Sequence, residues 1–319
     1  MANVVSGQLK DANVKGKPRD LMDTIFNVAP TDTPFLTMCG KSTASQTLHE
    51  WQTDTLASPA ENAVPEGADT TAFSESCTTE LSNRTQILKK AINVSGTAQA
   101  VKQAGVNRQY AYQMALRTKE LKKDVEYALL QNKMSRADNG STEGRLMTGL
   151  PCWMQTNYAT DGGTKADGAG TACTAGTTRV PTEAMLKALL TDIYNAGGNP
   201  DRIMMAPDIR VKMSEVLSGG ATKMERAEKK KATAVIDVYV SDFGSLKLVP
   251  NRVQAFEPFS RTCAFVLDPQ YWKVAYLRPF REERLAVTGD SLKGHVLVEC
   301  TLEARNDASS GVLADLKSA

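Results

Sequence analysis

Histidine and long apolar runs are scarce in this sequence of 319 residues, and both absences exclude classes of protein. The two histidines, His49 and His295, belong to no His-Glu-x-x-His pattern and lie near no cysteine pair. A zinc site needs about four closely arranged nitrogen, sulfur or oxygen ligands. No apolar run approaches the roughly 18–20 residues that span a bilayer. The N-terminal stretch lacks the apolar core of a secretory signal. We therefore expect no metal site, no membrane association and no secretory signal.

The six cysteines form no Cys-x-x-Cys pair. They are Cys39, Cys77, Cys152, Cys173, Cys263 and Cys300. A disulfide framework would be denser and is typical of exported proteins. The spacing therefore favours small buried thiols in a reducing cytoplasm.

Catalytic motifs are also missing. The triplet Gly40-Lys41-Ser42 resembles the end of a phosphate-binding loop, but Phe35 stands where that motif needs its first glycine. There is no Gly-x-Ser-x-Gly turn for a nucleophilic serine. Asp161 and Asp167 flank a glycine-rich stretch that lacks the alternating carboxylates of a calcium loop. We expect no catalytic residue and no cofactor, and an enzyme with a site assembled from remote residues stays a minor alternative.

Charge is balanced overall but strongly segregated along the chain. The net charge of +2 excludes polyanion binding by bulk electrostatics. Seven acidic residues and no lysine or arginine lie between Ser42 and Asn83, whereas 84–136 holds eleven basic and three acidic residues. Such blocks are often solvated surface. Equally, they favour contact between the acidic segment of one subunit and the basic surface of another.

Two extended runs lie at the two ends of the acidic segment. Residues 47–56 and 80–94 read as strands, separated by a polar loop at 57–79. A ribbon of two such strands would reach about 35–45 Å. Two-stranded ribbons are marginal alone, and this one has no apolar face. We therefore expect it to rest on a neighbouring subunit.

The longest helical pattern follows at 106–133, with apolar residues at three-, four- and seven-residue steps. The Ala-, Gly- and Thr-rich stretch 159–179 predicts a flexible surface loop. Beyond it, Thr182 and Pro207 begin two predicted helices around a short buried strand. Strands are predicted at 235–240, 245–249, 262–267, 271–277, 284–288 and 295–304, the last with Val296, Val298, Cys300, Leu302 and Ala304 inward and the intervening residues outward. This order of elements indicates an α+β fold.

Four stretches carry a resemblance to a known family. They are VAPTDTPFLTMCGK, NRTQILKKAINVSGT, KELKKDVEYALL and LVECTLEARNDASSGVLADL. The chain resembles the major head (capsid) proteins of tailed bacteriophages, most closely those of elongated-head podoviruses. That family has the capsid fold named for phage Hong Kong 97. The resemblance follows the order of the parts and covers most of the chain.

The resemblance implies a division of the chain. It places an N-terminal arm at 1–45, an extended β-hairpin loop at 46–94 and a peripheral domain at 95–149 with a spine helix at 106–133. It places an axial domain at 150–290 and a returning peripheral strand at 291–319. Because the chain begins almost at the arm, any scaffold is expected to be a separate protein. No lysine, asparagine and glutamate set for covalent cross-linking can be matched.

The implied function is that of a major capsid protein. It would assemble as a homo-oligomer of hexamers and pentamers into an icosahedral or prolate shell around non-specifically packaged double-stranded DNA. Portal, scaffolding and decoration proteins are the implied partners, and assembly would occur in the bacterial cytoplasm. A protein-enclosing compartment shell of the same fold is the alternative. The predicted inter-subunit contact residues are Trp51, Glu61, Glu66, Asp69, Arg84, Lys89 and Lys90.

Overall fold

A computed structural model describes residues 30–69, 73, 75, 77–101, 103, 106–168, 170–219 and 238–318. Most of the predicted arm and the first residues of the strand predicted at 235–240 lie outside the described residues. The helices are α1 (Pro34–Met38), α2 (Gly96–Ala100), α3 (Gln109–Leu130), α4 (Leu150–Trp153), α5 (Glu183–Asn195), α6 (Pro207–Gly219) and α7 (Pro258–Arg261). The strands are β1 (Gly40–Thr43), β2 (Leu48–Thr53), β3 (Thr79–Arg84), β4 (Gln86–Ser95), β5 (Asn157–Ala159), β6 (Arg202–Met205), β7 (Val238–Ser241), β8 (Gly244–Pro250), β9 (Ala264–Leu267), β10 (Trp272–Arg284), β11 (Ser291–Ala304) and β12 (Gly311–Leu313).

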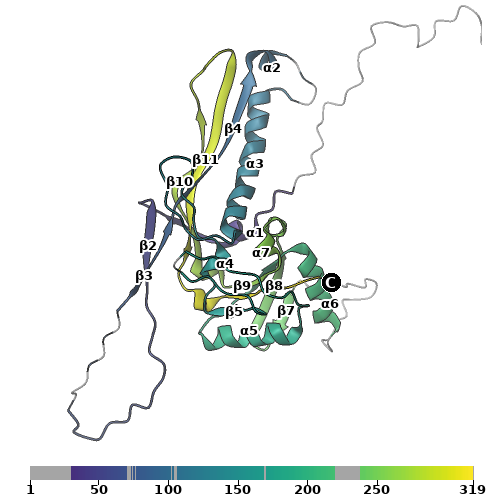
Figure 1. Cartoon of the computed structure of the whole chain (residues 1–319). Helices are drawn as coiled ribbons and strands as arrows, with labels where there is room; N and C mark the ends of the chain where they lie inside the picture. The colour runs from purple at the N-terminus through teal and green to yellow at the C-terminus, as the bar shows by residue number, and fades with distance from the viewer. Residues whose placement is uncertain are drawn as a thin grey trace, which may run out of the picture.

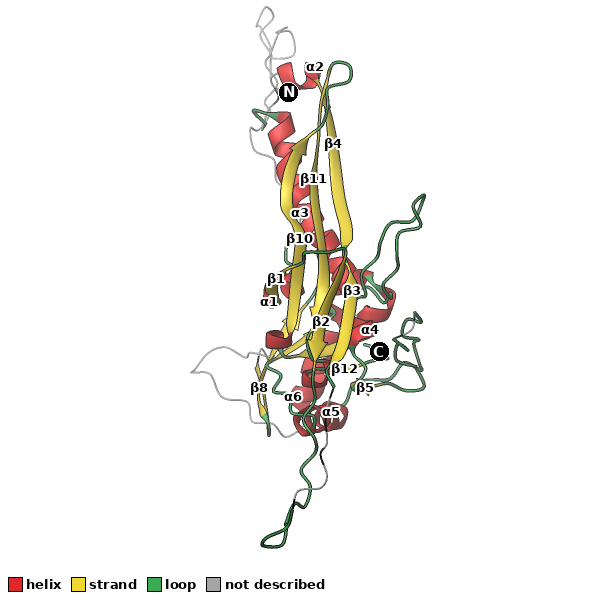
Figure 2. Ribbon diagram, turned by 90° about the vertical axis from the view of Figure 1, so that its left-hand side faces the viewer, coloured by secondary structure: helices red, strands yellow, loops and turns green. Residues whose placement is uncertain are grey.

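An elongated sheet of four strands, in the order β1-β10-β11-β4, forms one half of the molecule. The long helix α3 runs beside it, packed against β4 and β11 (Figures 1 and 2). The apolar row that predicts this helix is buried at Tyr110, Met114, Leu121, Val125 and Leu129. Packing of that row against the sheet explains a helix this long, because propensity alone would not stabilise it.

The helix is shorter than predicted, with 22 residues from Gln109 to Leu130 instead of 106–133. It ends because Gln131 adopts extended backbone angles. The carbonyl oxygen of Gln131 lies only 1.9 Å from the position that a Cβ atom would take on Gly149. Glycine is therefore the residue that allows the chain before α4 to pass so close to the end of α3.

A second sheet of six strands, in the order β5-β12-β9-β6-β8-β7, forms the other half. Helix α5 packs against β5 and β12, and α6 packs against β8. As predicted, α5 is capped by Thr182, whose hydroxyl accepts from the Met185 amide at 3.3 Å, and α6 begins at Pro207. One face of this sheet adds Met204 and Phe265 to the core around α3. The other face packs on α5 and α6 around Ile193, Ile203 and Met213 and forms a second hydrophobic core.

The predicted ribbon is corrected by the pairing of its second strand. Only residues 79–84 pair with β2, from Leu48↔Arg84 to Thr53↔Thr79. Residues 86–95 instead form β4 and pair with β11, from Cys300↔Gln86 to Ser291↔Ser95. The predicted second strand is thus divided between two sheets, and six residue pairs span only about 20 Å.

Strand β11 is buried on both faces rather than on one. The predicted outward residues Leu297, Glu299, Thr301 and Glu303 are all at most 7% exposed. Strand β11 is central, between β10 and β4, and the ribbon and the 145–148 segment cover its second face. The strands predicted at 271–277 and 284–288 are also corrected, because β10 is one strand that ends at Arg284.

Three further expectations change. The stretch 159–179, predicted as a flexible surface loop, buries Ala166 and Cys173 and is tied to Asp315 through the Gly176 amide at 2.7 Å. Five cysteines are buried, but Cys77 is exposed. Sheet membership also crosses the predicted domain boundaries, because β10 joins the elongated sheet and β12 joins the six-stranded one.

Candidate assembly interface

Residues 54–69, which follow β2, extend away from the rest of the molecule (Figure 1). Every residue from 54 to 69 is exposed, including Leu56 at 99% and Val64 at 76%. The acids Glu61, Glu66 and Asp69 take part in none of the ion pairs found among the described residues. A segment that buries so little gains nothing from its own subunit to offset the entropy of ordering it.

The root of the ribbon, which we define as residues 83–85 where β3 gives way to β4, is in contrast held by buried hydrogen bonds. The Asn83 side-chain amide donates to the carbonyl oxygens of Leu302 (2.8 Å) and Thr148 (3.3 Å). The Thr148 amide in turn donates to Asn83 Oδ1 at 2.8 Å. Asn83 is fully buried. These bonds satisfy polar groups that would otherwise be costly to bury, so they fix the direction in which the ribbon leaves the sheet.

A buried carboxylate completes this root. Glu299, on β11, is 2% exposed and accepts a hydrogen bond from the Thr85 hydroxyl at 2.8 Å. It forms ion pairs with Arg145 (2.5 Å) and Arg278 (2.7 Å). Thr85 is the residue between β3 and β4, so the network clamps the chain where it passes from one sheet to the other.

Trp51 lies on the inner face of the ribbon. Its indole Nε1 donates to the Ala304 carbonyl oxygen at 2.8 Å, and its ring lies 5.4 Å from that of Trp153. Trp51 was predicted as an inter-subunit contact, and the structure gives it partners within its own chain. It therefore helps to hold the ribbon on β11.

Glu303 makes a second ionic contact beneath the ribbon. Its carboxylate accepts from Arg305 at 2.7 Å and lies 3.4 Å from the ring nitrogen of His49. Burial alone would raise the pKa of Glu303, but the hydrogen bond from Arg305, followed by those from other neighbours, lowers it below the ordinary value. The charged form is therefore favoured, and it keeps β2 tied to the end of β11.

The predicted basic contacts lie along and beside β4, an edge strand of the elongated sheet. Lys89 is exposed, Arg84 is half-buried at the end of the ribbon, and Lys90 pairs with Asp124 at 2.9 Å. Lys89 and Lys90 therefore lie on opposite faces of β4, and the exposed acidic segment 54–69 lies apart from them within one subunit (Figure 1). Sequence reasoning missed the anchors Asn83, Thr85 and Glu299, because single polar residues in a polar strand carry no distinctive pattern.

Glu126 is a further anchor that sequence reasoning missed. It lies on the buried side of α3 and accepts from the backbone amides of Phe35 (2.8 Å) and Leu36 (2.7 Å). The Asn251 side chain donates to the same carboxyl group at 2.6 Å. Burial raises the pKa of Glu126, and these three hydrogen bonds oppose the rise. These contacts join α1 and α3 to the residue that follows β8, and no local pattern in the sequence indicates them.

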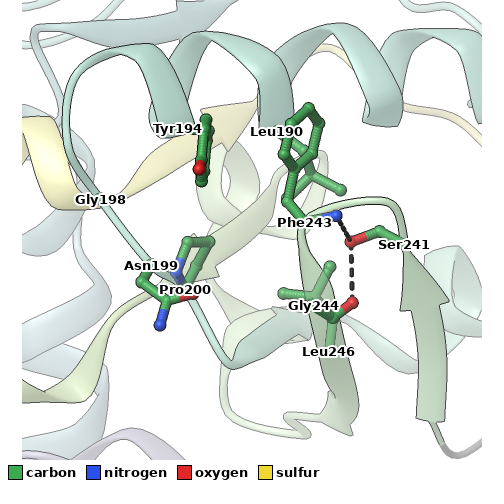
Figure 3. Close-up of a pocket in the computed structure, with 9 residues that line it drawn as sticks. All are labelled: Leu190, Tyr194, Gly198, Asn199, Pro200, Ser241, Phe243, Gly244 and Leu246. Carbon is green, nitrogen blue, oxygen red and sulfur yellow. Dashed lines mark hydrogen bonds between the residues drawn. The ribbon is translucent and has the colours of Figure 1, made fainter.

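Other candidate sites offer little chemistry. The described residues contain no group of three or more His, Cys, Asp or Glu side chains placed to hold a metal ion. Among these residues no helix has the length and apolarity to cross a membrane. A small pocket between α5 and β8 is lined by Leu190, Tyr194 and Phe243 together with polar backbone (Figure 3). Its Ser241 hydroxyl already donates to the Gly244 carbonyl at 2.8 Å, so the pocket presents no activated nucleophile.

Comparison with known proteins agrees with this architecture. The sequence model of the SU10 major capsid protein family matches residues 4–317. The chain is 29% identical over 336 residues to the major capsid protein of Escherichia phage Phieco32, covering 93% of this chain and 94% of that protein.

Two solved structures show the same fold at low identity. The capsid asymmetric unit of cyanophage A-1(L) superposes with a TM-score of 0.64 at 15% identity, covering 96% of this chain and 98% of that one. The holo-SrpI encapsulin complex from Synechococcus elongatus gives 0.59 at 11% identity, with 98% and 97% covered. The fold expected from the resemblance is confirmed. Fold alone does not separate phage shells from encapsulins, but the family match over nearly the whole sequence does. The chain therefore belongs to the SU10 major capsid protein family, and it is a structural protein of the phage head.

Proposed function

We propose that the subunit assembles into the hexamers and pentamers of a closed icosahedral or prolate shell, with the 54–78 loop of each subunit lying on its neighbour. The observation that carries the proposal is the contrast between the loop and its root. Every residue from 54 to 69 is exposed, yet this segment leaves the molecule from a root fixed by Asn83 and Glu299. A rigid root that presents an unpartnered loop suits contact with another copy.

Opposite charges on the loop and on β4 favour a contact between the loop of one subunit and β4 of the next. Glu61, Glu66 and Asp69 lie at one end of the molecule, and Lys89 lies on the exposed face of β4. Because they are apart within one subunit, their pairing requires a second copy. Each exposed ion pair contributes only about 0.2–1 kcal/mol. Repetition around a shell multiplies this contribution, and salt should weaken it.

The shell would enclose double-stranded DNA without reading its sequence, which needs no base-contact motif. Portal, scaffolding and decoration proteins are the further partners in this proposal, and the host cytoplasm is the place of assembly. The subunit acts as a building block and not as a catalyst. An encapsulin-like role is the second candidate, because the SrpI encapsulin shares the fold. Nuclease-resistant DNA in purified shells supports the first role, whereas shells that hold only protein cargo support the second.

Charge reversal tests the loop contact. The triple variant Glu61→Lys, Glu66→Lys and Asp69→Lys should fold normally but require about tenfold more protein to assemble, because about 1–3 kcal/mol is lost per loop. Circular dichroism measures folding, and sedimentation with electron microscopy measures assembly. Adding Lys89→Glu to the triple variant should restore part of the assembly, since every subunit then carries both reversed surfaces.

Asp192→Lys is the matched control, because Asp192 is exposed on α5 far from the loop. It should assemble like the wild type. Loss of folding in the triple variant, or assembly equal to that of Asp192→Lys, contradicts the loop contact.

A further inference from the structure

Two of the buried cysteines lie together although they are 21 positions apart in the sequence. Cys152 is in α4, and Cys173 is in the loop before α5. The Cys173 thiol donates to the carbonyl oxygen of Pro151, the residue before Cys152, at 3.4 Å. The side-chain amide of Asn132 holds both residues: its oxygen accepts from the Cys152 thiol (3.3 Å) and from the Cys173 amide (3.1 Å), and its nitrogen donates to the Cys173 carbonyl oxygen (2.7 Å).

The two sulfurs have different surroundings. The Cys152 side chain and the Ala166 backbone amide both lie beside the Cys173 sulfur. The Tyr158 hydroxyl is buried, has no satisfied partner among the described residues, and lies next to the same sulfur. The hydrogen bond from Cys152 lowers the pKa of Cys173 and outweighs burial, whereas the same contact and burial raise the pKa of Cys152. A lowered pKa favours the thiolate, which is the reactive form, so we expect Cys173 to be the attacking sulfur of the pair.

The remaining buried cysteines lack this arrangement. Burial is the largest cause that raises the pKa of Cys39, Cys263 and Cys300. The placement of Cys152 and Cys173 is thus a specific feature of the junction between α4 and the loop.

We propose that Cys152 and Cys173 form an oxidation site that closes to an intrasubunit disulfide when the protein meets a peroxide. The Cys173 thiolate attacks one peroxide oxygen, the O–O bond breaks, and the leaving hydroxide takes up a proton to become water. Cys173 is now a sulfenic acid. The Cys152 sulfur attacks the Cys173 sulfur, the S–O bond breaks, and the thiol proton leaves with the oxygen as a second water. The two thiols lose two electrons, and the peroxide gains them.

The disulfide would join two parts of the chain that are otherwise held by hydrogen bonds. The sulfurs must approach to about 2 Å, and the glycine-rich loop allows this movement. The enclosed segment includes β5, which pairs with β12. The link would therefore fasten an edge of the six-stranded sheet to the end of α3.

Peptide mapping tests the proposal directly in the full-length protein. Trypsin cuts after Arg145, Lys165 and Arg179, so Cys152 and Cys173 fall on the separate peptides 146–165 and 166–179. The protein is treated with hydrogen peroxide until the exposed Cys77 reacts, then denatured and alkylated before digestion. We expect a linked pair of these two peptides to accumulate, while Cys263 and Cys300 stay alkylated. Full alkylation of both peptides after Cys77 has reacted overturns the proposal.

Variants test the order of attack. In Cys152→Ser, a dimedone probe should label the sulfenic acid of Cys173. In Cys173→Ser, Cys152 should stay unlabelled. Tyr158→Phe should slow linkage, because the Tyr158 side chain favours the Cys173 thiolate and its loss is only partly offset by the higher nucleophilicity of a more basic thiolate. Labelling of Cys152 in Cys173→Ser, or an unchanged rate of disulfide formation in Tyr158→Phe, contradicts the assigned roles. As a control, protection of Cys263 from alkylation in the native protein confirms that each variant is folded.

Discussion

Asn83 provides the sharpest test of the buried root of the ribbon. In Asn83→Ala, the buried Thr148 amide loses its acceptor, and the carbonyl oxygens of Thr148 and Leu302 lose a donor. An unsatisfied buried donor costs about 1–3 kcal/mol, and the two carbonyl oxygens add less, because each has a second lone pair. We therefore expect the free energy of unfolding of the unassembled subunit to fall by about 2–4 kcal/mol.

Urea unfolding of the unassembled subunit, followed by circular dichroism, measures this loss. Asn93→Ala is the matched control, because Asn93 is exposed on the neighbouring strand β4 and should cost less than about 1 kcal/mol. Limited proteolysis provides a local readout, since the 54–78 loop should be cut faster when its root is loosened. A loss in Asn83→Ala no larger than that in Asn93→Ala would refute the reasoning that hydrogen bonds of Asn83 fix the ribbon.

Two further variants test the junctions around α3. Glu126→Gln should lower stability by about 1–3 kcal/mol, because one of the amides of Phe35 and Leu36 loses a good acceptor. Burial raises the folded-state pKa of Glu126. Its contribution to the free energy of unfolding is therefore complete below the ordinary glutamate pKa and is lost as pH rises through the raised pKa. The difference in urea midpoint between wild type and Glu126→Gln should shrink over that pH range, and a constant difference contradicts this prediction. Gly149→Ala should cost at least about 1–3 kcal/mol, since the new Cβ meets the Gln131 carbonyl oxygen. Gly144→Ala has open space around it and should cost little; equal melting temperatures for the two alanine variants would contradict this packing argument.

Local patterns were sufficient where a single element decides its own structure. The apolar row of α3, the Thr182 cap of α5 and the proline that begins α6 all act within a few residues. Each could therefore be predicted from the sequence. The exposed acidic loop was also predictable, because its charge and turn residues exclude a core position.

Pairing between distant strands was not predictable. Nothing within 80–94 shows that the chain changes sheets at Thr85, because that change depends on β11, more than 200 residues later. The continuous strand β10 was missed because Pro279 suggests an end. The structure places it within the register shift between Arg278 and Arg281 in the pairing with β11, where a missing amide is tolerated. The buried acids Glu126 and Glu299 were missed for the same reason, since only tertiary contacts distinguish them from surface acids.

Composition misled the prediction for 159–179. Small residues usually bury little surface, and here they allow close approach of backbone instead. The Thr164 and Thr174 backbones bond to each other, and Asp315 accepts from the Gly176 amide. The loop is therefore ordered by hydrogen bonds more than by apolar contacts.

Isotope-mixed cross-linking tests the central claim most directly. Shells are assembled from equal amounts of ¹⁴N- and ¹⁵N-labelled subunits and treated with a zero-length reagent that joins carboxylates to amines. The account predicts links from Glu61, Glu66 or Asp69 to Lys89 in which one peptide is light and the other heavy, as often as the two have the same label. Links found only between peptides of the same label would place the loop on its own subunit and contradict the proposed assembly.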